Sequence, residues 1–196
     1  MINVYYNNKK IEKEGQFLTP EETALQPVIS LKLLNTNNSN YYTLILYDPN
    51  SVRAPNYLHW AVINISLKNN MIFIGNQVNE GVNQGNNLIQ YQGPSPPENS
   101  GIHNYTFLIY KQDKNYGPEF ISSIDKNNRN YKYLMEKLNL NSNNKLISKT
   151  YFTSKHTGEK GGKKIVKERV NYKQGKSNKR EKKINKKRKT IKNKYI

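Results

Sequence analysis

Residues 93–110 read GPSPPENSGIHNYTFLIY. A loop rich in Pro and Gly leads directly into an apolar run, which predicts a turn followed by a buried strand. His103 stands at the junction and Tyr105 follows two residues later, so the alternation of a strand places both side chains on one face. Pro96 and Pro97 have a fixed φ and stiffen the loop just upstream. The stretch therefore predicts a loop followed by a strand, and its prolines are either simple turn residues or the rigid wall of a site.

Short strand-like runs separated by Asn, Gly and Pro recur along the whole chain. We expect an arm with an edge strand at 2–6, and further strands at 28–34, 42–47, 59–65, 71–74, 105–110 and 146–152. Residues 35–40 and 75–90 read as loops, and a short helix is expected between Thr19 and Pro27. Only in residues 125–139 does the apolar pattern change from the period of a strand to that of a helix. Its apolar positions there are Tyr131, Leu134, Met135 and Leu138. This pattern predicts an all-β fold with minor α, a sandwich of antiparallel sheets with a helix late in the chain.

The positive charge of the chain is concentrated at its C-terminal end. Residues 155–196 hold 18 Lys/Arg and three Asp/Glu, a net charge of +15, whereas residues 1–154 carry only +3. We therefore expect a sandwich domain at 1–154 and a disordered, basic, low-complexity tail at 155–196. The abundance of Lys and Asn is also typical of AT-rich coding sequence, which would suit a viral or an AT-rich microbial source.

The sequence excludes several classes of protein. It contains no cysteine, which rules out disulfides, thiolate zinc sites and a cysteine nucleophile. No apolar run is long enough to span a membrane, and the first residues lack the apolar region of a signal peptide. The expected location is the cytoplasm, with the nucleus or a virion as alternatives.

Two further strand ends carry titratable side chains. Asp48 follows the apolar strand at 42–47, where Asp-Pro forces a turn, and a carboxylate at such a place usually bonds local backbone N–H groups. His59 opens the run HWAVINI, in which alternation groups it with Ala61 and Ile63, opposite Trp60. Taken singly, each of these residues is more often structural than functional.

Taken in order, these motifs resemble those of the phosphatidylethanolamine-binding protein (PEBP) family, which includes the Raf kinase inhibitor proteins and bacterial relatives. The motifs are LTP with QP near the start, DPN at 48–50, HWAVIN at 59–64 and GPSPPENSGIHNY at 93–105. The resemblance covers roughly residues 18–152. It departs from the family at Asn50, where a second Asp is usual, and in a shorter segment before His59 that contains Arg53.

The resemblance implies a non-enzymatic binding module with a small anion pocket at the strand ends. Its ligand would be a phosphate-bearing small molecule or a phospholipid head group, and binding would serve to regulate kinases or proteases. The implied ligand-binding residues are Asp48, His59, Pro96, Pro97, His103 and Tyr105, with no catalytic residue, metal or cofactor, and the protein partner stays open. Protonated His and the Tyr105 hydroxyl would donate to phosphate. Asp48 would accept from a histidine and favour its imidazolium form, or would accept from the ammonium of the ligand.

Three other interpretations remain open from the residues themselves. The basic tail could bind nucleic acid by counterion release, or anionic membranes. Less favoured is a metal-dependent enzyme in which the two histidines and Asp48 hold the ion. A Ser–His–Asp hydrolase is disfavoured because no Gly-x-Ser-x-Gly motif occurs. Arg53 could contact phosphate, although a solvated loop Arg is the more usual case.

Overall fold

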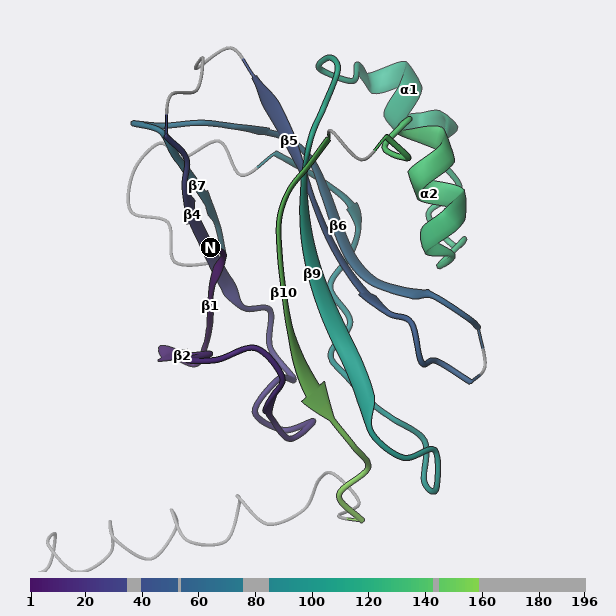
Figure 1. The fold of residues 1–196 in the computed structure, drawn as a ribbon. Coiled ribbons are helices and arrows are strands. Elements are labelled where there is room, and N and C mark those ends of the chain that lie inside the picture. Colours follow the sequence, from purple (N-terminus) through teal and green to yellow (C-terminus); the bar gives the residue numbers. More distant parts are fainter. Residues whose placement is uncertain (35–39, 53, 76–84, 143–144, 159–196) are drawn as a thin grey trace, which may run out of the picture. The chain divides into compact units, whose positions relative to one another are not determined.

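The fold is known from a computed structural model that describes residues 1–34, 40–52, 54–75, 85–142 and 145–158. These residues form two β-sheets and two short helices, arranged in three layers (Figure 1). The predicted tail falls almost wholly outside them, since 159–196 is not described. The prediction of a mostly-β sandwich with a helix late in the chain is confirmed.

The smaller sheet has the strand order β2-β1-β4-β7, and the larger sheet has the order β3-β10-β9-β5-β6-β8. The strands of the first are β1 (Asn3–Tyr6), β2 (Lys9–Lys10), β4 (Val28–Lys32) and β7 (Met71–Ile74). Those of the second are β3 (Gln16–Phe17), β5 (Tyr41–Asp48), β6 (Tyr57–Ser66), β8 (Asn86–Ile89), β9 (His103–Lys111) and β10 (Leu146–Ser154). Neighbouring strands are antiparallel, apart from the parallel pair of β3 and β10, so the expectation of purely antiparallel sheets needs that one correction.

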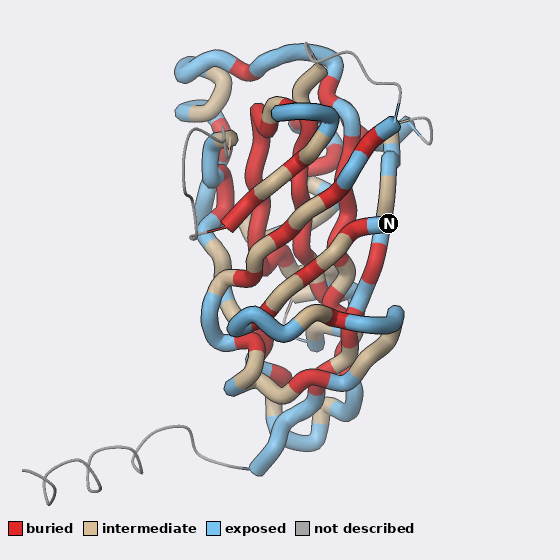
Figure 2. Tube along the Cα trace, turned by 90° about the vertical axis from the view of Figure 1, so that its left-hand side faces the viewer, coloured by how far each residue is buried: buried red, intermediate tan, exposed pale blue. Residues whose placement is uncertain are grey.

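Two apolar cores hold the layers together. One lies between the sheets and joins residues such as Val4, Ile29 and Phe107. Along β1, β4 and β7 buried positions alternate with less buried ones, as expected for a sheet with one covered face (Figure 2). The second core lies between the larger sheet and the helices α1 (Pro118–Ser123) and α2 (Tyr131–Lys137). Because both faces of the larger sheet are covered, its central strands are buried almost throughout.

The predicted helix face of residues 125–139 is confirmed, but the helix is shorter than the periodic pattern. Leu134, Met135 and Leu138 are buried in the second core. The helix begins at Tyr131 because the side chain of Asn130 caps it, accepting hydrogen bonds from the backbone N–H groups of the next turn. Helix α1 was not predicted, because its six residues are too few to show a helical period in the sequence.

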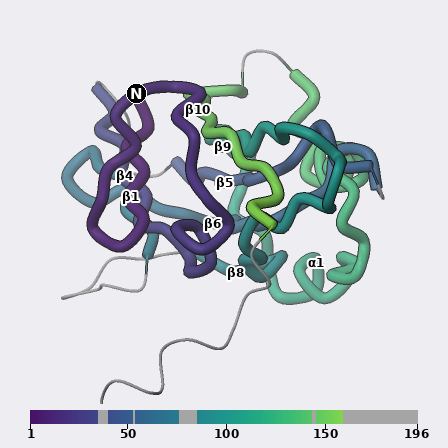
Figure 3. The backbone as a smooth tube through the Cα atoms, turned by 90° about the horizontal axis from the view of Figure 1, so that it is seen from below, coloured from purple at the N-terminus to yellow at the C-terminus, as the bar shows by residue number. Residues whose placement is uncertain are grey.

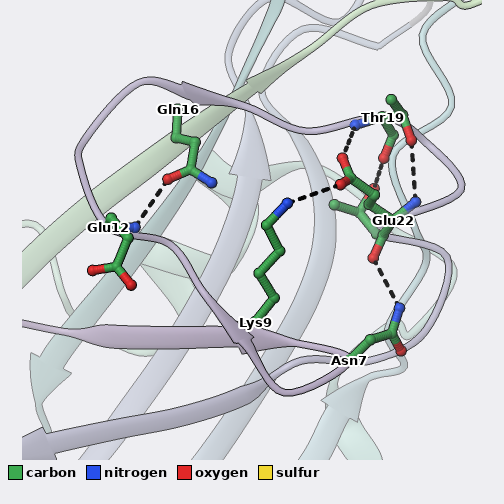
Figure 4. Close-up of polar contacts among 7 residues, drawn as sticks. Asn7, Lys9, Glu12, Gln16, Thr19 and Glu22 are labelled. Atoms are coloured by element: carbon green, nitrogen blue, oxygen red, sulfur yellow. Dashed lines mark hydrogen bonds and ion pairs between the residues drawn. The ribbon is translucent and has the colours of Figure 1, made fainter.

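Two other local predictions are wrong. No helix forms after Thr19; the chain makes a single turn there, in which the backbone N–H of Thr19 donates to Glu22 Oε2 and that of Glu22 donates to Thr19 Oγ1 (Figure 4). This is a capping box that is followed by one turn in place of a helix, and Pro27 disfavours a helical conformation of Gln26 just beyond it. Residues 75–90 were expected to be loop, yet Asn86–Ile89 form β8 beside β6. Residues 76–84 and the predicted loop residues 35–39 lie outside the described chain.

A β-bulge interrupts β6 at His59. Leu46 pairs with Trp60 and Tyr47 pairs with Leu58, so His59 is the extra residue between two consecutive pairs. The simple alternation that grouped His59 with Ala61 is therefore wrong. Bulges re-aim side chains, and this one turns His59 toward Tyr105 of β9, with ring centroids 5.1 Å apart.

Candidate functional site: a cavity at the strand ends

A cavity of about 370 Å³ opens at the end of the larger sheet where β5 ends and β9 begins. Figure 3 views the molecule from the end at which β9 begins and β10 finishes. The cavity is lined by Asp48, Ser51, Tyr57, His59, Gln92, Gly93, Ser95, Pro96, Pro97, Glu98, His103, Tyr105 and His156. All six residues that the sequence singled out are thus brought together around one cavity.

Asp48 and His103 form a buried pair at the base of this cavity. Nδ1 of His103 lies 2.7 Å from Oδ2 of Asp48, and only a few per cent of either side chain is exposed. The other carboxylate oxygen, Oδ1, accepts from the backbone N–H of Asn50 at 2.8 Å. Both oxygens of Asp48 are therefore occupied within the protein, and its carboxylate holds the His103 ring in place.

The second ring nitrogen of His103 is bound as well. Nε2 lies 2.9 Å from Oγ of Ser100, and that hydroxyl donates its hydrogen to the carbonyl oxygen of Pro97 at 2.6 Å. With the hydroxyl hydrogen directed at Pro97, Oγ serves as the acceptor for Nε2–H. Both nitrogens of His103 are then donors, which is the arrangement of an imidazolium facing a carboxylate. The same bonds tie the proline-rich loop to the start of β9.

His59 differs from His103 because one of its nitrogens is open to the cavity. Nδ1 donates to the carbonyl oxygen of Gln92 at 2.8 Å, whereas Nε2 has no partner among the described residues. The ring packs edge-on against Tyr57 and Tyr105. Burial lowers the pKa of His59, an effect only partly offset by the bond to Gln92 and the charge of Asp48. This environment thus favours a neutral imidazole with an open Nε2.

Tyr105 adds a hydroxyl group to the same wall. Its ring is stacked on Phe152 in the core between the sheets, with centroids 5.2 Å apart, so its position is fixed. Burial, followed by the charge of Asp48, raises the pKa of Tyr105, so the phenol stays protonated. No described residue bonds its hydroxyl, which therefore remains able to donate to a ligand.

Asn50 accounts for one departure from the family pattern. Its Oδ1 accepts from the backbone N–H of Asn104 at 3.0 Å, linking the turn after β5 to β9. A neutral amide serves here because the contact needs only an acceptor. Arg53, the other candidate on this turn, lies outside the described residues.

Sequence reasoning missed several residues of the lining. Tyr57 donates to Oε1 of Gln92 at 2.9 Å, which leaves the amide N–H groups of Gln92 for other partners. Glu98 and His156 also line the cavity, and both are exposed. Glu98 belongs to the quoted proline-rich stretch and could have been noticed there. His156 had been assigned to the tail, and no local pattern indicates that it returns to this site.

The geometry bears on the two enzymatic alternatives. A metal held by the two histidines and Asp48 would need a free nitrogen on His103, but both are hydrogen-bonded. The described residues contain no group of three or more His, Asp or Glu side chains arranged to hold an ion. Ser100, His103 and Asp48 have the distances of a catalytic triad, yet the Ser100 hydrogen points to Pro97, away from the ring.

Comparison with known proteins agrees with this fold and its motifs. The sequence model of the family described as phosphatidylethanolamine-binding protein matches residues 4–155. The chain belongs to the phosphatidylethanolamine-binding protein family. This confirms the resemblance carried by the ordered motifs.

Individual relatives are distant. The putative odorant-binding protein A5 of Drosophila melanogaster is 28% identical over 117 residues, 57% of this chain and 49% of that protein. The 26 kDa secreted antigen of Toxocara canis is 32% identical over 116 residues, 57% of this chain and 38% of that protein. The chain thus spans about half or less of the length of these curated relatives.

Solved structures show the same fold. A chain in the crystal structure of carboxypeptidase Y inhibitor complexed with its cognate proteinase superposes with a TM-score of 0.60 at 22% identity. The match covers 79% of this chain and 82% of that one.

Neither helix of the described residues is long and apolar enough to cross a membrane.

Proposed function

We propose that this protein is a non-enzymatic binding module that holds a phosphate-bearing ligand, free or as a phospholipid head group, in the strand-end cavity. The observation that carries the proposal is a pair of polar atoms on its wall that are open to a ligand. Nε2 of His59 and the hydroxyl of Tyr105 face the cavity without partners among the described residues. Phosphate oxygens are strong acceptors, and a protonated imidazole and a phenol are suitable donors for them.

The electrostatics refine the scheme inferred from the sequence, in which both histidines donate directly to the ligand. His103 already uses both nitrogens, so it contributes positive charge beneath the ligand, and His59 is the histidine that contacts it. Because burial favours neutral His59, a bound phosphate has to recruit a proton to Nε2 or bring one with it. Ligand binding and proton binding are therefore coupled in this proposal.

The cavity is held in shape before any ligand arrives, which reduces the entropic cost of binding. The bulge fixes His59, the Phe152 stack fixes Tyr105, and the bonds of Ser100 fix the loop. Pro96 is buried and Pro97 is half-buried, so both stiffen this wall. The volume lies near the lower end of the range of small-molecule sites, which suits a head group.

Calorimetric titration with O-phosphoethanolamine tests the proposal, with His59→Gln as the site variant and His156→Gln at the exposed mouth for comparison. We expect saturable one-to-one binding by the wild type and a loss of affinity of tenfold or more in His59→Gln. A smaller loss is expected for His156→Gln. Equal affinity in the wild type and in His59→Gln would contradict the proposal.

The charge of residues 155–196 supports a second candidate function, binding of nucleic acid or anionic membranes through the tail. All described strands and helices lie within the compact unit Met1–Gly158, so truncation after Gly158 separates the two activities. Salt-sensitive binding to DNA or anionic vesicles that disappears on truncation would support the tail. Undiminished binding by the truncated protein would exclude it.

The third part of the proposal concerns a protein partner. The structurally similar inhibitor acts on carboxypeptidase Y, as its structure with the proteinase states, and regulation of a kinase or protease is the corresponding suggestion for this chain. An inhibition assay against carboxypeptidase Y tests it directly, with full retention of peptidase activity as the contradicting result.

A further inference from the structure

The lining of the cavity is poor in positive charge for a site that accepts phosphate. No Lys or Arg appears among the described residues that line it. The positive charge of His103 is cancelled by the carboxylate of Asp48, 2.7 Å away. The cavity wall favours neutral His59, because burial lowers the pKa of that ring. The phosphate-binding wall thus offers the Tyr105 hydroxyl, and Nε2 of His59 once it is protonated, with no excess of positive charge.

Glu98 adds a negative charge to this lining. It follows Pro96 and Pro97 on the stiffened loop, is exposed, and forms no ion pair with the described residues. The other acid of the lining, Asp48, is buried and has both oxygens bonded within the protein. Glu98 is therefore the carboxylate of the cavity that is free to contact a ligand, and its charge is paired with no cation of the lining.

This charge balance does not suit a bare phosphate dianion, because a proton recruited to His59 offsets only one of its two charges and the Glu98 carboxylate adds another. It suits a ligand that carries its own positive group next to the phosphate, since the phosphate faces the donors and the cation faces the acid. We propose that Glu98 is a specificity-determining residue that makes the cavity prefer aminoalkyl phosphates over alkyl phosphates of the same size. The inference rests on the proposed function, because it assumes that phosphate enters this cavity.

The carboxylate is solvent-exposed, so its effect on affinity is modest. Exposed ion pairs correspond to about a two- to fivefold change in a binding constant. The appropriate measurement is therefore a ratio of affinities for two ligands that differ only in the cation. O-Phosphoethanolamine and ethyl phosphate form such a pair, because they share the phosphate ester and the two-carbon chain.

Calorimetry of the full chain with both ligands, at low and at high salt, tests the inference. We expect the wild type to bind O-phosphoethanolamine about two- to fivefold more tightly than ethyl phosphate at low salt. In Glu98→Gln that ratio should fall to about one. Ethyl phosphate should bind more tightly because the repulsion by the carboxylate is removed, and the ammonium of O-phosphoethanolamine should lose its ion-pair partner. Glu98→Lys should invert the preference. Glu119→Gln removes an exposed acid of α1 that does not line the cavity, and should keep the wild-type ratio.

The outcomes separate the two proposals. Equal affinity of the wild type for both ligands, or a ratio unchanged in Glu98→Gln and Glu98→Lys, overturns the role of Glu98 and leaves the phosphate site standing. Failure of the wild type to bind either ligand contradicts the proposed function, and the role of Glu98 with it.

Discussion

Oδ2 of Asp48 lies 2.7 Å from Nδ1 of His103, and these two side chains, 55 residues apart in the sequence, are both almost completely buried. The pair joins the end of β5 to the start of β9 at the floor of the cavity. It explains how an acidic residue can belong to the proposed phosphate site. The carboxylate compensates the imidazolium and positions it, without facing the ligand.

Removing one member of this pair should destabilise the fold. Loss of one partner from a buried ion pair leaves the other uncompensated, at a cost of about 3–5 kcal/mol. We therefore expect Asp48→Ala to lower the free energy of unfolding by that amount in urea denaturation. Asp113→Ala is the matched control, because Asp113 is half exposed and pairs with Lys145 at the surface, where a change of about 1 kcal/mol or less is expected. Equal losses in the two variants would show that the buried pair has no special role.

Tyr105→Phe should separate ligand binding from stability. The hydroxyl has no partner among the described residues, so its removal leaves no protein group unsatisfied and should change the free energy of unfolding by less than about 0.5 kcal/mol. The phosphate ligand would lose one hydrogen bond, which contributes about 0.5–1.5 kcal/mol to binding. The dissociation constant should therefore rise roughly two- to twelvefold. Denaturation and calorimetry of the same preparation measure both quantities. A destabilised variant with unchanged affinity would refute the assignment.

The affinity should depend on pH through His59. Burial lowers its pKa from the ordinary value, and a phosphate at Nε2 raises it again, so binding takes up a proton. Affinity should then rise as the pH falls from about 7.5 through the ordinary His value near 6.5, by at most about tenfold per pH unit. Glycerophosphoethanolamine is the ligand of choice, because its phosphodiester does not itself titrate in this range. An affinity independent of pH in the wild type would argue against contact with His59.

Ser100 should not behave as a nucleophile, although it lies 2.9 Å from Nε2 of His103. Its hydrogen is directed to the carbonyl of Pro97, and His103 in the imidazolium form cannot act as a base. We expect no covalent labelling by a fluorophosphonate probe, as judged by the mass of the intact protein. Stoichiometric labelling that is lost in Ser100→Ala would favour a hydrolase instead.

Most of the fold could be predicted from the sequence, because strands with a covered face carry a strong local pattern. The runs at 42–47 and 105–110 are apolar and flanked by turn residues, and both lie within observed strands. The strand Asn86–Ile89 was missed because it begins with two Asn residues directly after Gly85, a composition typical of loops. This strand forms through pairing with β6. Tertiary pairing here outweighs local propensity.

Six residues of the cavity lining could be named from the sequence, but their arrangement could not, and their role in ligand binding stays a prediction. The ordered motifs bring Asp48, His59, His103 and Tyr105 to one cavity, as the resemblance implied. The bulge that turns His59 inward has no signal in HWAVINI, because it depends on the register with β5. The two histidines differ because His103 is bonded to Ser100 and His59 to the carbonyl oxygen of Gln92. These contacts cannot be inferred from the spacing of residues in the sequence.

The central claim is that a phosphate-bearing ligand enters the cavity and contacts His59 above the His103–Asp48 pair. Long-range ¹H–¹⁵N NMR of the imidazole groups, during titration with O-phosphoethanolamine, tests it most directly. The chain has only three histidines, so each ring can be assigned by single substitution. We predict that the His59 and His103 signals shift together along one saturation curve, with the larger change at Nε2 of His59. Signals of His59 and His103 that stay unmoved at saturating concentrations of the ligand would contradict the claim.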